Sequence, residues 1–415
     1  MGRDSQAQAS AVTKRSPRVA LVGAYDRFNY GDLLFPLVTA QVLGASAAAP
    51  QTTVYSLTQS DLSRFGALPT QPIGALYDGS FLRDGDICMV NGGGVLAVDW
   101  IYVYANTLGH LGNRVLQRLE RLVGQPRLDR WVAARFGGRA CAPFVMQPAD
   151  FTQQIKVVYN AVGGGAELRN LSDSRRQAVL QALARADYLS FRDDETMAVV
   201  GDLVPAHLAP DSAVLMSRHF PLETLVRLAS PQAVQAVQGD YVCLQAYLDF
   251  GQQHLSQIRA LIEAIYQQTG LPVLLLPIGR YPGLDDHLFL AALARQLQTP
   301  HILFSDQASV HDIMLAIAKA RLFIGTSLHG QITAQSFAVP HLGLGLTSPK
   351  LAAYLRTWDL PIQSACLDIA ASVGAMATVK AVLSISKEDL AAKRDQLVGL
   401  AQLNFNRLFA AAGLH

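Results

Sequence analysis

Short apolar runs alternate with helix-type patterns along the first half of the chain. The nearly continuous apolar runs lie at residues 18–23, 86–94, 156–165 and 188–193. Runs of this kind are typical of parallel strands that are covered by helices on both faces. Between them, residues 32–43 and 172–186 have the apolar spacing of helices. The first half therefore predicts a doubly wound parallel sheet.

The same alternation restarts in the second half, after a predicted loop of polar residues and proline at residues 217–239. Five further apolar runs lie at residues 241–246, 273–279, 301–305, 321–327 and 341–346. The first helix between them has one apolar stripe, formed by Leu255, Ile258, Leu261, Ile262 and Ile265. The pattern predicts a second parallel sheet.

The chain is therefore expected to form two Rossmann-like, doubly wound lobes that face a cleft, the α/β arrangement known as GT-B. We expect a flexible tail at residues 1–17, a first lobe at 18–220, a donor-binding second lobe at 240–385 and a C-terminal helix at 386–415. This last helix could pack back on the first lobe. Because ligands of open α/β sheets bind beyond the carboxyl ends of the strands, the residues directly after each strand are the candidates for function.

Composition restricts the functional classes further. Half of the 415 residues are hydrophobic and 16% are charged, below the ~25% usual for globular proteins, which favours buried strands. A net charge of +2 argues against a nucleic-acid partner. The four cysteines are far apart and form no CxxC pair, so reduced thiols fit better than disulfides or a zinc site. Without a signal-peptide pattern or an apolar run long enough to span a membrane, we expect a cytoplasmic protein.

The loop after the first strand reads GAYDRFNYGD and is a candidate for the cleft wall. Glycine at Gly31 permits a tight turn between strand and helix, and we expect Asn29, Tyr30, Gly31 and Asp32 to line the cleft or bind an acceptor. Asp32 has a second interpretation as the N-cap of the following helix. The loop does not match the GxGxxG pattern, so no dinucleotide cofactor is implied.

Two triple-glycine loops follow buried strands, in the sequences NGGG and VGGG. Free backbone amides in such loops can hold an anion or admit a ligand closely. We expect Gly93 and Gly94 to line the cleft, and Gly164 and Gly165 to contact the donor.

Arg192 directly follows a predicted strand and precedes the acidic start of a helix. A guanidinium gains nothing from the helix dipole there, whereas its planar fork matches a carboxylate or a phosphate. Arg192 is therefore a candidate catalytic residue. The other interpretation is a salt bridge to one of the neighbouring acids.

The segment TSLHG, residues 326–330, forms the turn from a predicted strand into a helix. Histidine exchanges protons near neutral pH, so His329 is a candidate acid–base group, with Ser327, Leu328 and Gly330 as a phosphate seat at the helix start. Lys350 follows the last predicted strand and could bring a cation into the cleft or lie on the surface. No pattern of a zinc peptidase, a serine hydrolase or a P-loop enzyme occurs, and no metal site is expected.

These segments, in this order, resemble the polysaccharide pyruvyl transferase family. The matching residues are Asn29 to Asp32, Gly92 to Gly94 with Asp99, Ser190 to Asp193 with Thr196, Pro210 with Asp211, and Ser327, His329 and Gly330 with Pro340. The resemblance spans residues 18–360. Some relatives carry arginine two residues before the histidine, where this chain has Ser327, so the missing cation would come from Arg192, Lys350 or Arg280.

The resemblance implies transfer of the enolpyruvyl unit of phosphoenolpyruvate onto a sugar as a pyruvate ketal, with release of phosphate and without a cofactor. The acceptor would be a polysaccharide or a lipid-linked oligosaccharide. Arg192 would hold the donor and His329 would act as acid and base. A GT-B glycosyltransferase that uses a nucleotide sugar is the alternative, and a non-catalytic sugar-binding protein is a third hypothesis.

An insertion at about residues 102–150 lies outside all of these motifs. Between Asn113 and Arg139 it contains seven arginines and two acids. One interpretation is a solvated helical insertion. The other is a contact with an anionic membrane or a lipid-diphosphate acceptor, which would place the protein peripherally at the inner membrane face.

Overall fold

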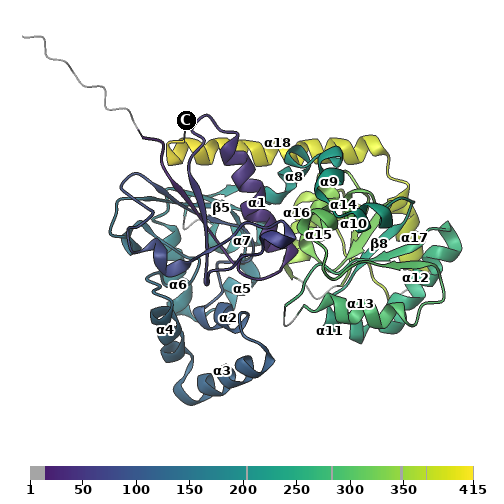
Figure 1. Cartoon of the computed structure of the whole chain (residues 1–415), viewed down its shortest axis with the longest axis horizontal. Coiled ribbons are helices and arrows are strands. Elements are labelled where there is room, and N and C mark those ends of the chain that lie inside the picture. The colour runs from purple at the N-terminus through teal and green to yellow at the C-terminus, as the bar shows by residue number, and fades with distance from the viewer. Residues whose placement is uncertain (1–14, 202–203, 282–283, 346–348, 371, 415) are drawn as a thin grey trace, which may run out of the picture.

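The computed structural model describes residues 15–201, 204–281, 284–345, 349–370 and 372–414. The tail prediction for residues 1–14 lies outside these described residues. Two parallel sheets lie side by side, each with helices on both faces (Figure 1). The predicted fold class is therefore confirmed.

The first sheet has seven parallel strands in the order β3-β2-β1-β4-β5-β6-β7. They are β1 (Val19–Val22), β2 (Thr52–Ser56), β3 (Gln71–Pro72), β4 (Ile87–Asn91), β5 (Lys156–Val162), β6 (Tyr188–Phe191) and β7 (His207–Leu208). The four strands predicted from apolar runs are the adjacent central strands β1, β4, β5 and β6, which are buried along almost their whole length. The strands outside them have exposed or half-buried positions, so their sequences lack continuous apolar runs.

Helices α1 to α7 accompany this sheet. They are α1 (Tyr30–Gly44), α2 (Trp100–Ala105), α3 (His110–Val123), α4 (Gln125–Arg135), α5 (Gly165–Arg169), α6 (Asp173–Leu183) and α7 (Asp194–Val200). Helix α1 starts two residues earlier than predicted, and its N-cap is Asn29. Asp32 is therefore not the cap; it lies in the first helical turn.

The prediction of a loop at residues 217–239 was wrong. This segment forms three short helices, α8 (Met216–His219), α9 (Leu222–Leu228) and α10 (Pro231–Ala236). Leu225 and Ala233 are buried in the same cluster as residues of α14 (Val310–Ala318). Helices of four to seven residues show too few turns for their apolar period to stand out against the polar residues and prolines.

The second sheet has five parallel strands in the order β10-β9-β8-β11-β12. They are β8 (Val242–Gln245), β9 (Val273–Leu275), β10 (His301–Leu303), β11 (Leu322–Gly325) and β12 (His341–Gly343). The remaining helices of this lobe are α11 (Leu248–Gln253), α12 (Leu255–Thr269), α13 (Asp286–Ala294), α15 (Leu328–Ser336), α16 (Pro349–Trp358) and α17 (Ser372–Leu383). Helix α12 buries four of the five residues of its predicted stripe, and Leu255 is partly buried.

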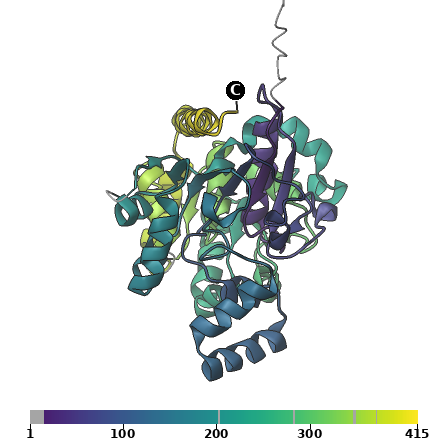
Figure 2. The ribbon, with the colours of Figure 1, turned by 90° about the vertical axis from the view of Figure 1, so that its left-hand side faces the viewer.

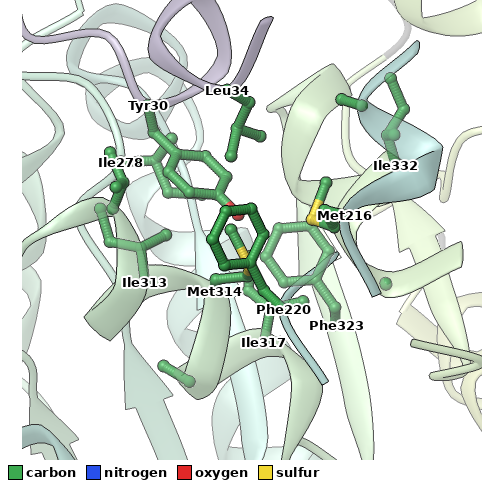
Figure 3. Packing of buried hydrophobic residues seen from close by; sticks show 14 of the residues in the cluster. Tyr30, Leu34, Met216, Phe220, Ile278, Ile313, Met314, Ile317, Phe323 and Ile332 are labelled. Atoms are coloured by element: carbon green, nitrogen blue, oxygen red, sulfur yellow. The ribbon is translucent and has the colours of Figure 1, made fainter. Parts of the chain in front are cut away.

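One hydrophobic cluster joins the two lobes (Figure 3). Tyr30 and Leu34 of α1 pack there with Phe323 of β11 and Ile332 of α15. The hydroxyl of Tyr30 also forms a hydrogen bond of 2.8 Å with Thr333 Oγ1. This shared core fixes the start of α1 against the start of α15, and the residues at both helix starts reach the cleft.

The C-terminal helix α18 (Lys387–Ala412) runs from the second lobe back across the first (Figure 1). Its Leu408 joins a cluster with residues of β1, and Asn404 donates a hydrogen bond of 2.7 Å to Asn160 of β5. No helix within the described part of the chain is long and apolar enough to cross a membrane.

Candidate functional site

The cleft lies where the strand order of each sheet reverses, between β1 and β4 and between β8 and β11. This is the position at which open α/β sheets bind ligands. Two adjoining cavities of about 340 and 400 Å³ occupy it. We name the cavity of about 340 Å³ the His329 cavity and the cavity of about 400 Å³ the Tyr102 cavity, after one lining residue of each. Both are lined by Asn29, Asp32, Gly93, Gly94, Glu167, Tyr281 and Lys350.

Helix α15 begins at the wall of the His329 cavity. Ser327 is its N-cap, because the hydroxyl accepts a hydrogen bond of 3.2 Å from the amide of Gly330. The amide of Ser327 donates to Gln245 Oε1 at 2.9 Å. The first amides of a helix have no partner within the helix, so those of Leu328 and His329 are available for an anion.

The imidazole of His329 is held on three sides. Its Nε2 lies 3.7 Å from Asp211 Oδ2, and Phe35 packs edge-to-face against the ring with centroids 5.0 Å apart. Gly31 covers the Nδ1 side so closely that a Cβ atom there would overlap the ring. Glycine at this position is therefore needed for the observed place of His329.

Arg192 and Asp211 form a buried ion pair beside the imidazole. The side chain of Arg192 is only 2% exposed, and its Nη1 donates to Asp211 Oδ2 at 3.1 Å. Trp358 Nε1 donates to the carbonyl of Arg192 at 2.6 Å and fixes the backbone. Burial alone would raise the pKa of Asp211, but the neighbouring His329 and then Arg192 outweigh it and hold that pKa below its usual range. Asp211 is therefore an ionised carboxylate that lies between the guanidinium and the imidazole.

The sequence left open whether Arg192 makes a salt bridge or holds an anion. The structure shows a salt bridge, and the anion-binding role stays a prediction. Its main partner is Asp211 rather than the adjacent Asp193, whose Oδ2 lies 3.9 Å from Nε. Arg192 also lines the His329 cavity. Arg192 Nε and His329 Nε2 are both buried, and neither has a hydrogen-bond partner among the described residues. Both residues line the His329 cavity, so these nitrogens are available to a ligand there.

Lys350 supplies a second cation at the boundary of the two cavities. Its side chain keeps contact with solvent, while enclosure by the cleft and then the charge of Arg192 lower the pKa of its ammonium. Arg280, the third candidate for the missing cation, lines neither cavity. It stacks on Phe28 and donates to the carbonyl of Ala308 at 2.6 Å.

A buried carboxyl group completes the far wall of the His329 cavity. Asp286 Oδ2 accepts hydrogen bonds from Gln245 Nε2 at 2.9 Å and from the amides of Ile278 and Gly279 at 3.0 Å. Its Oδ1 is buried and has no partner among the described residues. Burial raises the pKa of Asp286 to about 7, although the three donors oppose the shift.

The Tyr102 cavity is lined by charged and aromatic side chains. Arg27 Nη2 lies 3.4 Å from Asp32 Oδ2, and Arg175 Nη1 lies 3.3 Å from Asp99 Oδ2. Tyr102 and Tyr281 add aromatic surface. Carboxylates accept and guanidinium groups donate hydrogen bonds, so this wall suits a ligand with several hydroxyl groups.

Comparison with known families gives an assignment for the segment that carries the Arg192, Asp211 and His329 cluster. Residues 145–348 match the polysaccharide pyruvyl transferase family. This segment belongs to that family. The description of the family implies transferases with a polysaccharide acceptor. The predicted family is confirmed. No curated protein matches the chain by sequence.

Solved structures with the same fold are similar over nearly the whole chain. A UDP-GlcNAc 2-epimerase from Methanocaldococcus jannaschii is 12% identical, with a TM-score of 0.52 over 89% of this chain and 93% of that one. The MnaA protein of S. aureus with UDP is 12% identical, with a TM-score of 0.54 over 96% and 98%. A UDP-GlcNAc 2-epimerase from Neisseria meningitidis is 10% identical, with a TM-score of 0.52 over 95% and 100%. At these identities the likeness shows a shared GT-B-type fold.

Nine of the predicted site residues line the two cavities. They are Asn29, Asp32, Gly93, Gly94, Arg192, Ser327, Leu328, His329 and Lys350. The other five line neither cavity, and their expected contact with a ligand stays a prediction. Tyr30 packs between the lobes, Gly31 supports His329, Gly330 packs on Phe323, Gly164 faces Leu96, and Gly165 faces Thr196.

Several cavity residues were missed by the sequence analysis. Arg27 lies in the first candidate loop, and its place shortly after a strand is a signal that could have found it. Gln245 is the last residue of β8, so the expectation that residues at strand ends carry function could have found it. Glu167, Arg175 and Tyr281 come from two helices and a loop, and only the packing of those elements turns them toward the cleft. No local sequence signal marks these last three residues.

Asp286 predicts a measurable dependence of stability on pH. Its pKa is raised on folding from 3.8 to about 7, so its stabilising contribution is complete below pH 3.8 and is lost as the pH rises to about 7. The loss is roughly 1.4 kcal/mol per pH unit across that window. Asp286→Asn keeps an acceptor for the three donors, and its stability relative to wild type should therefore rise between pH 4 and 7. Urea unfolding of both proteins at several pH values measures the difference in their free energies of unfolding. A difference that stays constant between pH 4 and 7 would contradict the raised pKa.

Proposed function

We propose that this protein transfers the enolpyruvyl unit of phosphoenolpyruvate to a sugar as a pyruvate ketal and releases phosphate. The observation that carries the proposal is the cluster of Arg192, Asp211 and His329, with unpartnered nitrogen donors in the wall of a cavity. The cluster lies within the segment that matches the polysaccharide pyruvyl transferase family.

The His329 cavity has the groups that a small dianionic or trianionic donor needs. Phosphoenolpyruvate carries a phosphate and a carboxylate, and both are strong acceptors. Arg192 and Lys350 supply positive charge, and the first amides of α15 supply oriented donors. Ser327 and Leu328 form the seat at the helix start.

In the proposed reaction His329 gives a proton to the methylene carbon of the donor, which becomes a methyl group. The oxygen of one sugar hydroxyl bonds to the central carbon, and its proton returns to the imidazole. The bond from the central carbon to the phosphate oxygen then breaks. A second hydroxyl takes the vacated position, and its proton leaves with the phosphate. The positive charge that develops on the central carbon is stabilised by nearby carboxylates.

The 3.7 Å gap between His329 Nε2 and Asp211 is compatible with this role. Hydrogen bonds of catalytic groups are often long before substrate binds and shorten in the complex. Asp211 would orient the imidazole and stabilise its charged form while the proton is in transit.

The acceptor sugar is assigned to the Tyr102 cavity. The two cavities share Asp32, Gly93 and Lys350, so hydroxyls held on one side can meet the donor held on the other. The family match ends before Lys350 and does not cover residues 102–144, which line part of this cavity or support it. Acceptor choice would therefore vary independently of donor chemistry.

Ligand stabilisation tests the donor. Phosphoenolpyruvate at 100 times its Kd should add about 2.7 kcal/mol to the free energy of unfolding, visible as a higher melting temperature. Lys350→Gln should reduce this stabilisation because it removes a cation from the cavity. The matched control is Lys319→Gln, since Lys319 is exposed and lines neither cavity.

The second measurement is phosphate release from phosphoenolpyruvate with a sugar acceptor. Stabilisation by a nucleoside diphosphate, with neither stabilisation nor phosphate release from phosphoenolpyruvate, would replace the proposal with a glycosyltransferase. A protein unaffected by either ligand, and by loss of both Arg192 and His329, would be a binding protein.

A further inference from the structure

Helix α3 presents an apolar ridge to solvent. The ridge consists of Leu111, Val115, Leu119 and Leu122, which are 73%, 55%, 41% and 81% exposed. Their spacing of four, four and three residues places them along one side of the helix. Among the residues of α3 whose burial is described, 111–123, only Leu116 is buried, and it joins the core of the first lobe. The helix is thus attached by one face and leaves a second apolar face uncovered.

Arginines border this ridge. Arg114, Arg118 and Arg121 project from the side of α3 next to it and are exposed. None of the three has an ion pair among the described residues. The neighbouring α4 adds Trp131, 55% exposed, on the same face as Arg127. An apolar ridge, flanking cations and an exposed tryptophan together match helices that lie in a membrane interface.

We propose that α3 binds the surface of an anionic lipid bilayer, with the leucine ridge among the acyl chains and the arginines at the headgroups. A second copy of this chain fits the ridge less well. A symmetric contact would bring Arg114, Arg118 and Arg121 of one copy toward the same residues of the other, and like charges repel. A lipid surface brings opposite charge instead.

The position of α3 fits this role. It lies at the end of the molecule opposite α18, beyond α2 and α4 (Figures 1 and 2). Helix α2 at its base provides Tyr102 and Val103 to the wall of the Tyr102 cavity. If the proposed function holds, α3 would therefore set this cavity beside a bilayer that carries a lipid-linked acceptor. Membrane binding itself does not depend on that function.

Flotation of the full chain with vesicles tests the inference. We expect binding to vesicles of phosphatidylcholine and phosphatidylglycerol at low salt, and little binding to phosphatidylcholine alone. Leu111→Ser with Leu122→Ser should weaken the binding at least ~10-fold, because two exposed leucines leave the ridge. Arg114→Gln, Arg118→Gln and Arg121→Gln together should weaken it roughly 10- to 100-fold. The matched control is Leu228→Ser with Leu403→Ser, which changes leucines 48% and 43% exposed on α9 and α18.

Two outcomes would overturn the inference. One is the absence of binding to anionic vesicles at low salt, or binding that the α3 variants leave unchanged. The other is a wild-type dimer that the leucine variant converts to a monomer, which would assign the ridge to a second copy. Phosphate release with a water-soluble acceptor is measured on the same proteins. Failure of that reaction alone would count against the proposed function and leave the flotation result intact.

Discussion

Replacement of His329 by alanine is expected to lower turnover roughly 100- to 10,000-fold with much less change in donor binding. The reason is that a positioned acid–base group acts mainly in the transition state, whereas Arg192 and Lys350 hold the charge of the donor. Phosphate release at saturating phosphoenolpyruvate gives turnover, and thermal stabilisation by phosphoenolpyruvate gives binding. His207→Ala is the control, because His207 is an exposed histidine on β7 outside both cavities.

A second variant separates the effect of misplacing the imidazole of His329 from the effect of removing it. Gly31→Ala keeps the imidazole but forces it away from its place, since the added Cβ would overlap the ring. Turnover should fall while stabilisation by phosphoenolpyruvate persists, because Arg192 and Lys350, which hold the charge of the donor, are unchanged. If His329→Ala retained near-normal turnover, His329 would be only part of the phosphate seat, and another group would have to protonate the donor.

The central strands could be predicted because each is buried along almost its whole length. A strand covered on both faces needs a continuous apolar run, and β1, β4, β5 and β6 have one. The strand β2 has two half-buried positions at its start and therefore lacks that signal. The segment 217–239 was misread for a related reason, since its apolar contacts are made by helices too short to show a period.

The candidate site could be predicted only as far as strand ends determine it. His329 and Arg192 follow β11 and β6 and are 3.7 and 3.1 Å from one carboxylate. That carboxylate, Asp211, follows the edge strand β7 and was known only as part of the family resemblance. A glycine loop at a strand end does not reveal which glycines face the ligand. Gly93 lines a cavity whereas Gly164 faces Leu96, and that difference depends on how the loops pack.

The ion pair of Arg192 and Asp211 is expected to be the most costly polar contact to break. Both side chains are almost completely buried, at 2% and 0% exposure. Asp211→Ala leaves the guanidinium without its main counter-charge and should reduce the free energy of unfolding by about 3–5 kcal/mol. Urea unfolding at neutral pH measures the loss. Asp173→Ala is the control, because its pair with Arg176 is exposed and is worth at most about 1 kcal/mol.

Acid provides an independent check of the same pair. Because folding lowers the pKa of Asp211 from 3.8, its contribution is present above that value and is lost as the pH falls through the lower, folded-state pKa. Wild type should therefore lose stability relative to Asp211→Asn as the pH drops below about 4. For Asp286 the expected loss of stability occurs instead as the pH rises. A cost of Asp211→Ala below about 1 kcal/mol would mean that water or a neighbouring acid replaces the lost charge. Arg192 would then be free to serve the donor alone, and Asp211 would no longer be the group that links arginine and histidine.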